Sequence, residues 1–198
     1  AEAGPNGIRW LGINRGDSGF AAYRKLQAGY VPTKTVSGPK SAIGIVMDHA
    51  FQTQHVRASE SADFVYNLTK WLDQNHDTFK GKFVHAKMMT VKNLVAYLDQ
   101  GMLEPLHEGT IKYLKEKGVW KASYQARQDK ILTIVNKRIA IFQDALDAAD
   151  KLNTTKGQKL YRKIYTVPDN KNWQAFWKDY KKQRGLTKTF GEEIAAIK

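Results

Sequence analysis

The sequence predicts an α+β fold that is mainly α, with a small sheet, several helices and a helical C-terminal tail. Three observations predict this class. Apolar segments with strand character occur before residue 57, helical periodicity dominates from Ser59 onward, and an aromatic stripe with helical spacing lies near the C-terminus. An apolar fraction of 42% and an aromatic fraction of 11% over 198 residues are typical of a globular chain that buries a core.

The sheet is expected in the N-terminal third of the chain. Residues 8–13 are apolar and lie between turn residues, which predicts a short buried strand. Residues 17–28 have the pattern of a short helix, and residues 41–56 have the pattern of one or two strands. The loop between them is predicted by its turn residues, which are Pro32, Gly38 and Pro39.

Four helices are predicted in the middle of the chain. Their expected ranges are 59–75, 90–101, 109–117 and 123–152. Ser59 or Ser61 caps the first helix, Thr90 caps the second, and Gly101 ends the second. The last helix is the most regular of the four, because apolar residues recur in it with helical spacing from Ile131 to Ala149.

The tail, residues 153–198, combines aromatic and basic side chains. Aromatic residues at i, i+3, i+4 and i+7 lie along one face of a predicted helix over residues 170–184, and a last short helix carries Ile194 and Ile197. Such a stripe more often packs into a core, but it can also form a protein interface. The residues assigned to that candidate interface are Trp173, Phe176, Trp177, Tyr180, Lys181 and Arg184. Binding to a membrane surface is a further alternative for the same helix.

The net charge of +13 is concentrated in the tail. Residues 151–198 contain twelve Lys or Arg against four Asp or Glu, a net charge of +8. This asymmetry favours an anionic partner, although a solvated surface explains it equally well. Nucleic acid is the weakest choice, because no nucleic-acid-binding motif accompanies the charge. The chain contains no cysteine and no apolar run of the roughly 18 residues that a transmembrane helix needs.

The sequence contains no pattern that indicates catalysis, so we expect a protein that is not an enzyme and that holds no metal or cofactor. The five histidines, which are His49, His55, His76, His85 and His107, show no metal-ligand spacing. His49 and His55 are expected on one face of a strand pair, as structural residues. The turn after residues 8–13 contains Asn14 and Arg15, which we identify as candidate anion-binding residues, with a plain surface turn as the alternative.

Residues 105–118, Pro-Leu-His-Glu-Gly-Thr-Ile-Lys-Tyr-Leu-Lys-Glu-Lys-Gly, resemble a family signature. The signature is Pro-Leu-His-x-Gly-Ala-x-x-Tyr-x-x-Glu-x-Gly of the TAXI family, the periplasmic solute-binding proteins of tripartite (TRAP) transporters. Thr110 departs from it, because the family usually has a small Ala there. Further segments that are similar to the family follow upstream in the expected order, at residues 7–13, 29–32 and 59–71. The resemblance covers roughly residues 7–120.

The resemblance implies part of a type II periplasmic-binding-protein fold. In the family, two lobes close around a small organic anion, such as a dicarboxylate or a glutamate-like acid, and deliver it to the TRAP membrane subunits. His107 is then expected to be a positioning residue that caps the following helix, and it joins Asn14 and Arg15 as a candidate ligand-binding residue. The N-terminal segments that meet the solute in the family are missing from this sequence. We therefore expect residues 1–120 to be a TAXI-like C-terminal portion, followed by a long helix over 121–152 and the tail over 153–198.

Two functions are consistent with this sequence. The first is a periplasmic solute-binding protein, or part of one, that acts as a receptor for a small organic anion. The second is a non-catalytic accessory subunit on a degenerate TAXI-like scaffold, which docks on an acidic protein partner such as a periplasmic enzyme complex. The basic tail would then speed the encounter and make it sensitive to salt.

Overall fold

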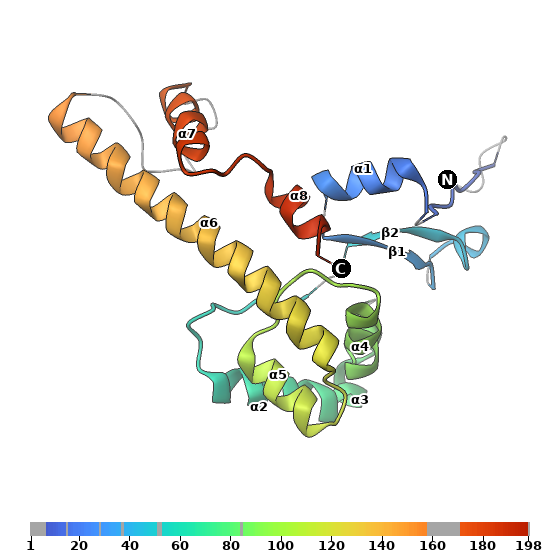
Figure 1. Ribbon diagram of the computed structural model, residues 1–198. Coiled ribbons are helices and arrows are strands. Elements are labelled where there is room, and N and C mark those ends of the chain that lie inside the picture. Colours follow the sequence, from blue (N-terminus) through green and yellow to red (C-terminus); the bar gives the residue numbers. More distant parts are fainter. Residues whose placement is uncertain are drawn as a thin grey trace.

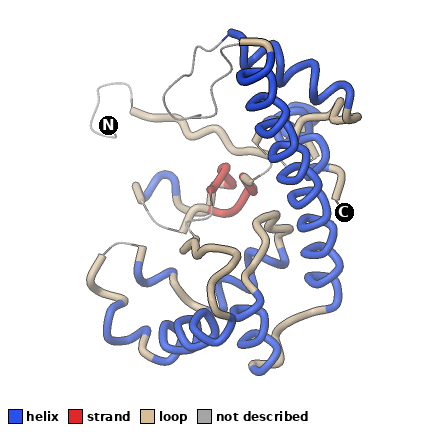
Figure 2. The backbone as a smooth tube through the Cα atoms, turned by 90° about the vertical axis from the view of Figure 1, so that its left-hand side faces the viewer, coloured by secondary structure: helices blue, strands red, loops and turns tan. Residues whose placement is uncertain are grey.

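The computed structural model confirms an α+β fold that is mainly helical (Figure 1). It describes residues 7–14, 16–27, 29–36, 38–50, 53–83, 85–157 and 171–197. A long helix, α6 (Ala122–Thr155), runs through the molecule. Four helices gather around its N-terminal end, which are α2 (Ala62–Gln74), α3 (His76–Phe79), α4 (Val91–Asp99) and α5 (Glu108–Glu116). Figure 2 shows the two short strands beside the long helix. In the part of the chain that the structure describes, each helix is too short or too polar to cross a bilayer.

The sheet consists of β1 (Tyr30–Lys34) and β2 (Val46–Ala50), which pair in antiparallel register and are connected through the 3₁₀ helix η1 (Lys40–Ala42). Pro32 lies inside β1, opposite Asp48, so the loop predicted from Pro32 begins too early. A proline is tolerated there because an edge strand does not need every backbone N–H for its ladder. Of the one or two strands predicted within 41–56, the described residues form one, β2. His55 lies outside any strand, so the expected strand pair containing His49 and His55 is wrong.

Residues 8–13 do not form the buried strand that their composition predicts. They run beside β2, and Ile13 N donates one hydrogen bond to Val46 O at 2.8 Å, which does not make a ladder. Leu11 is 74% exposed and Ile8 is 39% exposed. The predicted buried strand is therefore wrong, since residues 8–13 have no regular secondary structure and two of their apolar side chains are exposed.

The helices of the N-terminal two thirds begin and end close to the predicted positions. They are α1 (Ser18–Leu26), α2 (Ala62–Gln74), α4 (Val91–Asp99) and α5 (Glu108–Glu116). Between α2 and α4 lie the short helix α3 (His76–Phe79) and the 3₁₀ turn η2 (Ala86–Met88). The predicted caps are confirmed, because Ser61 Oγ accepts from Phe64 N and Thr90 Oγ1 accepts from Asn93 N. The short elements α3 and η2 were not predicted.

Helices α2 and α5 pack in direct backbone contact at Gly109. A Cβ atom at this position would lie 2.3 Å from Ala62 O and 2.7 Å from Tyr66 N. The ring of Tyr66 meets that of Tyr113 edge-on, at 5.9 Å between centroids. The contact therefore requires glycine in the first turn of α5, which gives a physical reason for the glycine of the 105–118 segment.

The threonine at position 110 has a specific role in the same contact. Thr69 Oγ1 donates to Val65 O at 2.8 Å, so its 3.1 Å contact with Thr110 Oγ1 is a hydrogen bond that Thr110 donates. This bond links α2 to α5 at the point where the sequence departs from the TAXI signature.

Replacing the Thr110 hydroxyl by a methyl group tests this link. We expect Thr110→Val to lower the free energy of unfolding by about 1 kcal/mol, because the part-buried Thr69 oxygen loses a donor. Urea denaturation measures the change. Thr133→Val is the matched control, since its hydroxyl is exposed and its one bond to a described residue stays within its own helix, to Asp129 O. Equal midpoints for the two variants would contradict the assigned role.

The C-terminal helices α7 (Lys171–Gln183) and α8 (Phe190–Ala195) confirm the helical tail. Ile194 of α8 is 1% exposed and packs with Leu103 and Ile131. Arg138 Nε of α6 binds Glu193 Oε2 of α8 at 2.6 Å. Helix α8 is thus anchored on α6, while the division of the chain at residues 120 and 152 stays a prediction.

Candidate functional site

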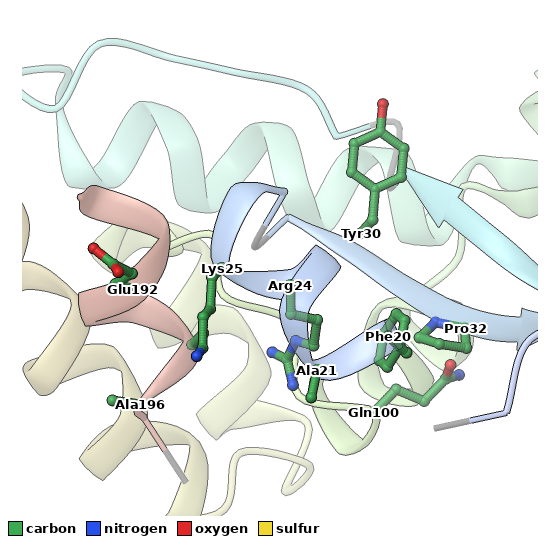
Figure 3. Close-up of a pocket in the computed structure, with 10 residues that line it drawn as sticks. Phe20, Ala21, Arg24, Lys25, Tyr30, Pro32, Gln100, Glu192 and Ala196 are labelled. Carbon is green, nitrogen blue, oxygen red and sulfur yellow. The ribbon is translucent and has the colours of Figure 1, made fainter. Parts of the chain in front are cut away.

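A cavity of about 380 Å³ lies between α1, β1, the end of α4 and α8, and we call it the small cavity. The lining residues that bear on its chemistry are Arg24 and Lys25 of α1, Gln100 after α4, and Glu192 of α8. In Figure 3, Arg24 and Lys25 extend from the same helix, between α8 on one side and Phe20 and Pro32 on the other. Segments more than 160 residues apart in sequence thus share this cavity.

The small cavity carries two cationic side chains against one carboxylate. Glu192 is engaged in a capping box, because its Oε2 accepts from Thr189 N at 2.6 Å and from Thr189 Oγ1 at 3.0 Å. The pKa of Glu192 is lowered, chiefly by the hydrogen bond from the Thr189 backbone. The bond from the Thr189 hydroxyl and the positive charge of Lys25 lower it further. The carboxylate is therefore held at the helix terminus, and the lining keeps a net positive charge.

Gln100 supplies a polar group to the same cavity. Its Oε1 atom is buried and has no hydrogen-bond partner among the described residues. Such an acceptor is costly to bury unless a ligand or water donates to it. Together with Arg24 and Lys25 it makes the small cavity suited to a molecule that combines an anionic group with a hydrogen-bond donor.

The predicted ligand-binding residues lie elsewhere. Asn14 is exposed, and its Oδ1 accepts from Gly16 N at 3.0 Å within the turn, while Arg15 lies outside the described residues. His107 caps α5 as predicted, with Nδ1 accepting from Gly109 N at 3.1 Å. Neither Asn14 nor His107 lines the small cavity. Sequence reasoning missed all four of these lining residues, Arg24, Lys25, Gln100 and Glu192, because nothing in the sequence shows that α8 returns to α1.

A second and larger depression of about 780 Å³, the large groove, lies between α2, α4, α5, the start of α6 and residues 53–58. His107 is at its wall. Gln128 of α6 fixes one edge, because its side-chain amide accepts from Leu106 N at 2.9 Å and donates to Leu106 O at 2.6 Å. The groove is built by helices rather than by loops alone.

Five of the six residues of the candidate partner interface lie on α7, and the sixth, Arg184, directly follows its last residue. Trp173 and Trp177 stack at 6.2 Å, and both meet Phe142 of α6 edge-on, at 6.0 and 5.4 Å. Lys181 lies over Trp177, and Arg184 lies over Tyr180 and donates to its hydroxyl at 2.8 Å. Phe176 packs against Trp173 and Tyr180. None of the α7 residues is fully buried, so the stripe packs on α6 and still presents partly exposed aromatic surface. Its role as an interface stays a prediction.

A helix-rich fold with cavities between segments distant in sequence is compatible with a binding protein. The family model of the NMT1-like family matches residues 18–118, which is 101 of the 198 residues. The chain therefore belongs to the NMT1-like family, a family of periplasmic-binding type. The matched range contains α1 to α5 and the whole 105–118 segment. No curated protein and no solved structure matches the chain.

Proposed function

We propose that the chain is a non-catalytic, TAXI-type solute-binding protein of the periplasm, or part of one, that receives a small organic anion for TRAP membrane subunits. Membership of a periplasmic-binding-type family supports the class, and the segment 105–118 favours the TAXI type. The observation that carries the proposal is the small cavity with Arg24 and Lys25 in its lining.

The chemistry of the small cavity favours a carboxylate. A guanidinium presents five N–H donors in a planar fork, which suits a carboxylate, and a lysine ammonium adds a second positive charge. A donor on the solute, such as an ammonium or hydroxyl group, would satisfy the buried Oε1 of Gln100. A short carboxylic acid with one donor group is therefore the proposed solute.

Calorimetric titration of the full chain with short mono- and dicarboxylates and acidic amino acids tests the proposal. We expect binding of at least one of them, and we expect Arg24→Gln to weaken it about tenfold or more through loss of charge-assisted hydrogen bonds. Lys130→Gln on the exposed face of α6 is the matched control and should bind as the parent does. If no carboxylate binds, or if Arg24→Gln binds normally, the small cavity is not the solute site.

A second candidate function is the accessory subunit that docks on an acidic protein. The partly exposed stripe on α7, with basic side chains over its rings, is the observation in its favour. Co-purification of an acidic partner would support this function. The partner should dissociate as the salt concentration is raised, and Trp177→Ala should abolish its binding.

A further inference from the structure

We propose that the large groove is a second ligand site, which binds an apolar molecule carrying a protonated amine. Its volume of about 780 Å³ falls within the range of small-molecule sites, roughly 300–1,000 Å³. The site is separate from the small cavity, since the two share no lining residue. The inference therefore does not depend on the solute proposed above.

The walls of the groove are largely apolar. Leu68 and Leu72 come from α2, Met88 from η2, Leu94 from α4 and Leu132 from α6, so four elements contribute to one apolar surface. All five side chains are only half-buried in the structure. A bound alkyl or aryl group would remove their remaining exposed surface from water, which is the usual driving force for such sites. The thioether of Met88 adapts readily to ligands of different shape.

The charge of the lining selects the sign of the ligand. Asp73, Glu104 and Glu108 line the groove, and no Lys or Arg stands among its described lining residues, although the chain carries +13 overall. Asp73 is already matched, because it accepts from Lys117 Nζ at 3.0 Å and from the Tyr113 hydroxyl at 2.7 Å. Within the described ranges, no ion pair involves Glu104 or Glu108. An amine is therefore attracted by unmatched carboxylates, and a fatty acid is repelled by them.

Glu104 is the residue that would bind the amine. Thr53 Oγ1 donates its proton to Glu104 Oε2 at 2.7 Å, across 51 residues of sequence, so the carboxylate is held in place. His55 Nε2 lies 3.2 Å from the same hydroxyl oxygen and must donate to it, since the hydroxyl proton is already used. An ionised carboxylate has about four acceptor positions, so Glu104 keeps capacity for an ammonium group.

A displacement assay on the full chain tests this proposal. The probe is N-phenyl-1-naphthylamine, whose fluorescence rises in apolar surroundings, and the competitors are decylamine, decanoate and decanol below their micelle concentrations. We expect the probe to bind, and decylamine to displace it at about one tenth of the decanoate concentration, as a charge-assisted contact implies. Leu94→Trp, which fills the groove, should abolish probe binding while far-UV circular dichroism stays unchanged.

Glu104→Gln isolates the charge, because glutamine keeps the shape and can still accept from Thr53. This variant should reduce the tenfold preference for decylamine to about twofold and leave decanol displacement unchanged. Glu192→Gln, in the small cavity, is the matched control and should keep the full preference. Failure of the probe to bind, equal displacement by decanoate and decylamine, or an unchanged preference in Glu104→Gln would each overturn the proposal.

Discussion

Gly109→Ala is expected to lower the free energy of unfolding by about 3 kcal/mol or more, which is at the upper end of the cost of overpacking. The added methyl group would lie 2.3 Å from Ala62 O, 2.7 Å from Tyr66 N and 2.9 Å from Val65 Cβ. Two of these three atoms belong to the backbone of α2, so no change of rotamer relieves the clash. Urea denaturation followed by far-UV circular dichroism measures the effect.

The clash can only be relieved if α2 and α5 move apart. The separation would weaken the hydrogen bond between Thr69 and Thr110 and the ion pair of Asp63 with Lys112, which spans 2.9 Å between Asp63 Oδ1 and Lys112 Nζ. Exposed ion pairs contribute little, so the larger loss comes from the packing of Val65 and Leu114, which are 3% and 0% exposed.

Gly19→Ala is the matched control for this variant. Gly19 lies in the first turn of α1, and a Cβ there would meet nothing within 4 Å. Alanine should leave the stability unchanged or raise it by up to about 1 kcal/mol, since it is the better helix former. If both alanine variants unfold at the parent's urea concentration, the close contact at Gly109 is wrong.

The helical part of the fold could largely be predicted from the sequence. Its signals are local: a cap residue at Ser61 or Thr90, an apolar stripe, and a glycine that ends the helix. Gly101, for example, has φ = +88°, a conformation that glycine adopts without strain. The prediction failed where the local structure depends on contacts with distant segments of the same chain. Residues 8–13 are as apolar as a strand, but whether they join a ladder depends on segments that are not adjacent in sequence.

The candidate sites depend on distant segments even more strongly. The resemblance to the TAXI signature implied that His107 caps the following helix, and the structure confirms this assignment. The small cavity, in contrast, requires Lys25 to meet Glu192, and the bond from Thr53 to Glu104 joins the segment between β2 and α2 to the segment between α4 and α5. No periodicity or spacing encodes these pairings, because each residue type is unremarkable at its own position.

Gly191→Ala is expected to affect ligand binding more than global stability. A Cβ atom at Gly191 of α8 would lie 1.9 Å from Lys25 O and 2.7 Å from Lys25 C. Helix α8 is anchored on α6 through Ile194 and through the ion pair of Arg138 with Glu193, so α1 is the element that has to move. Phe20 is the only residue of α1 that is fully buried, so this displacement should cost about 1–3 kcal/mol.

Moving α1 away from α8 widens the small cavity on the side of Lys25. We expect the affinity for the carboxylate to fall about tenfold or more, because Arg24 and Lys25 move relative to the rest of the lining. Binding of the apolar amine in the large groove should not change, since none of its lining residues belongs to α1 or α8. Gly81→Ala, where a Cβ meets nothing within 4 Å, is the matched control. Unchanged carboxylate affinity in Gly191→Ala would place the solute away from α1, whereas loss of both ligands would indicate general unfolding instead of a local displacement.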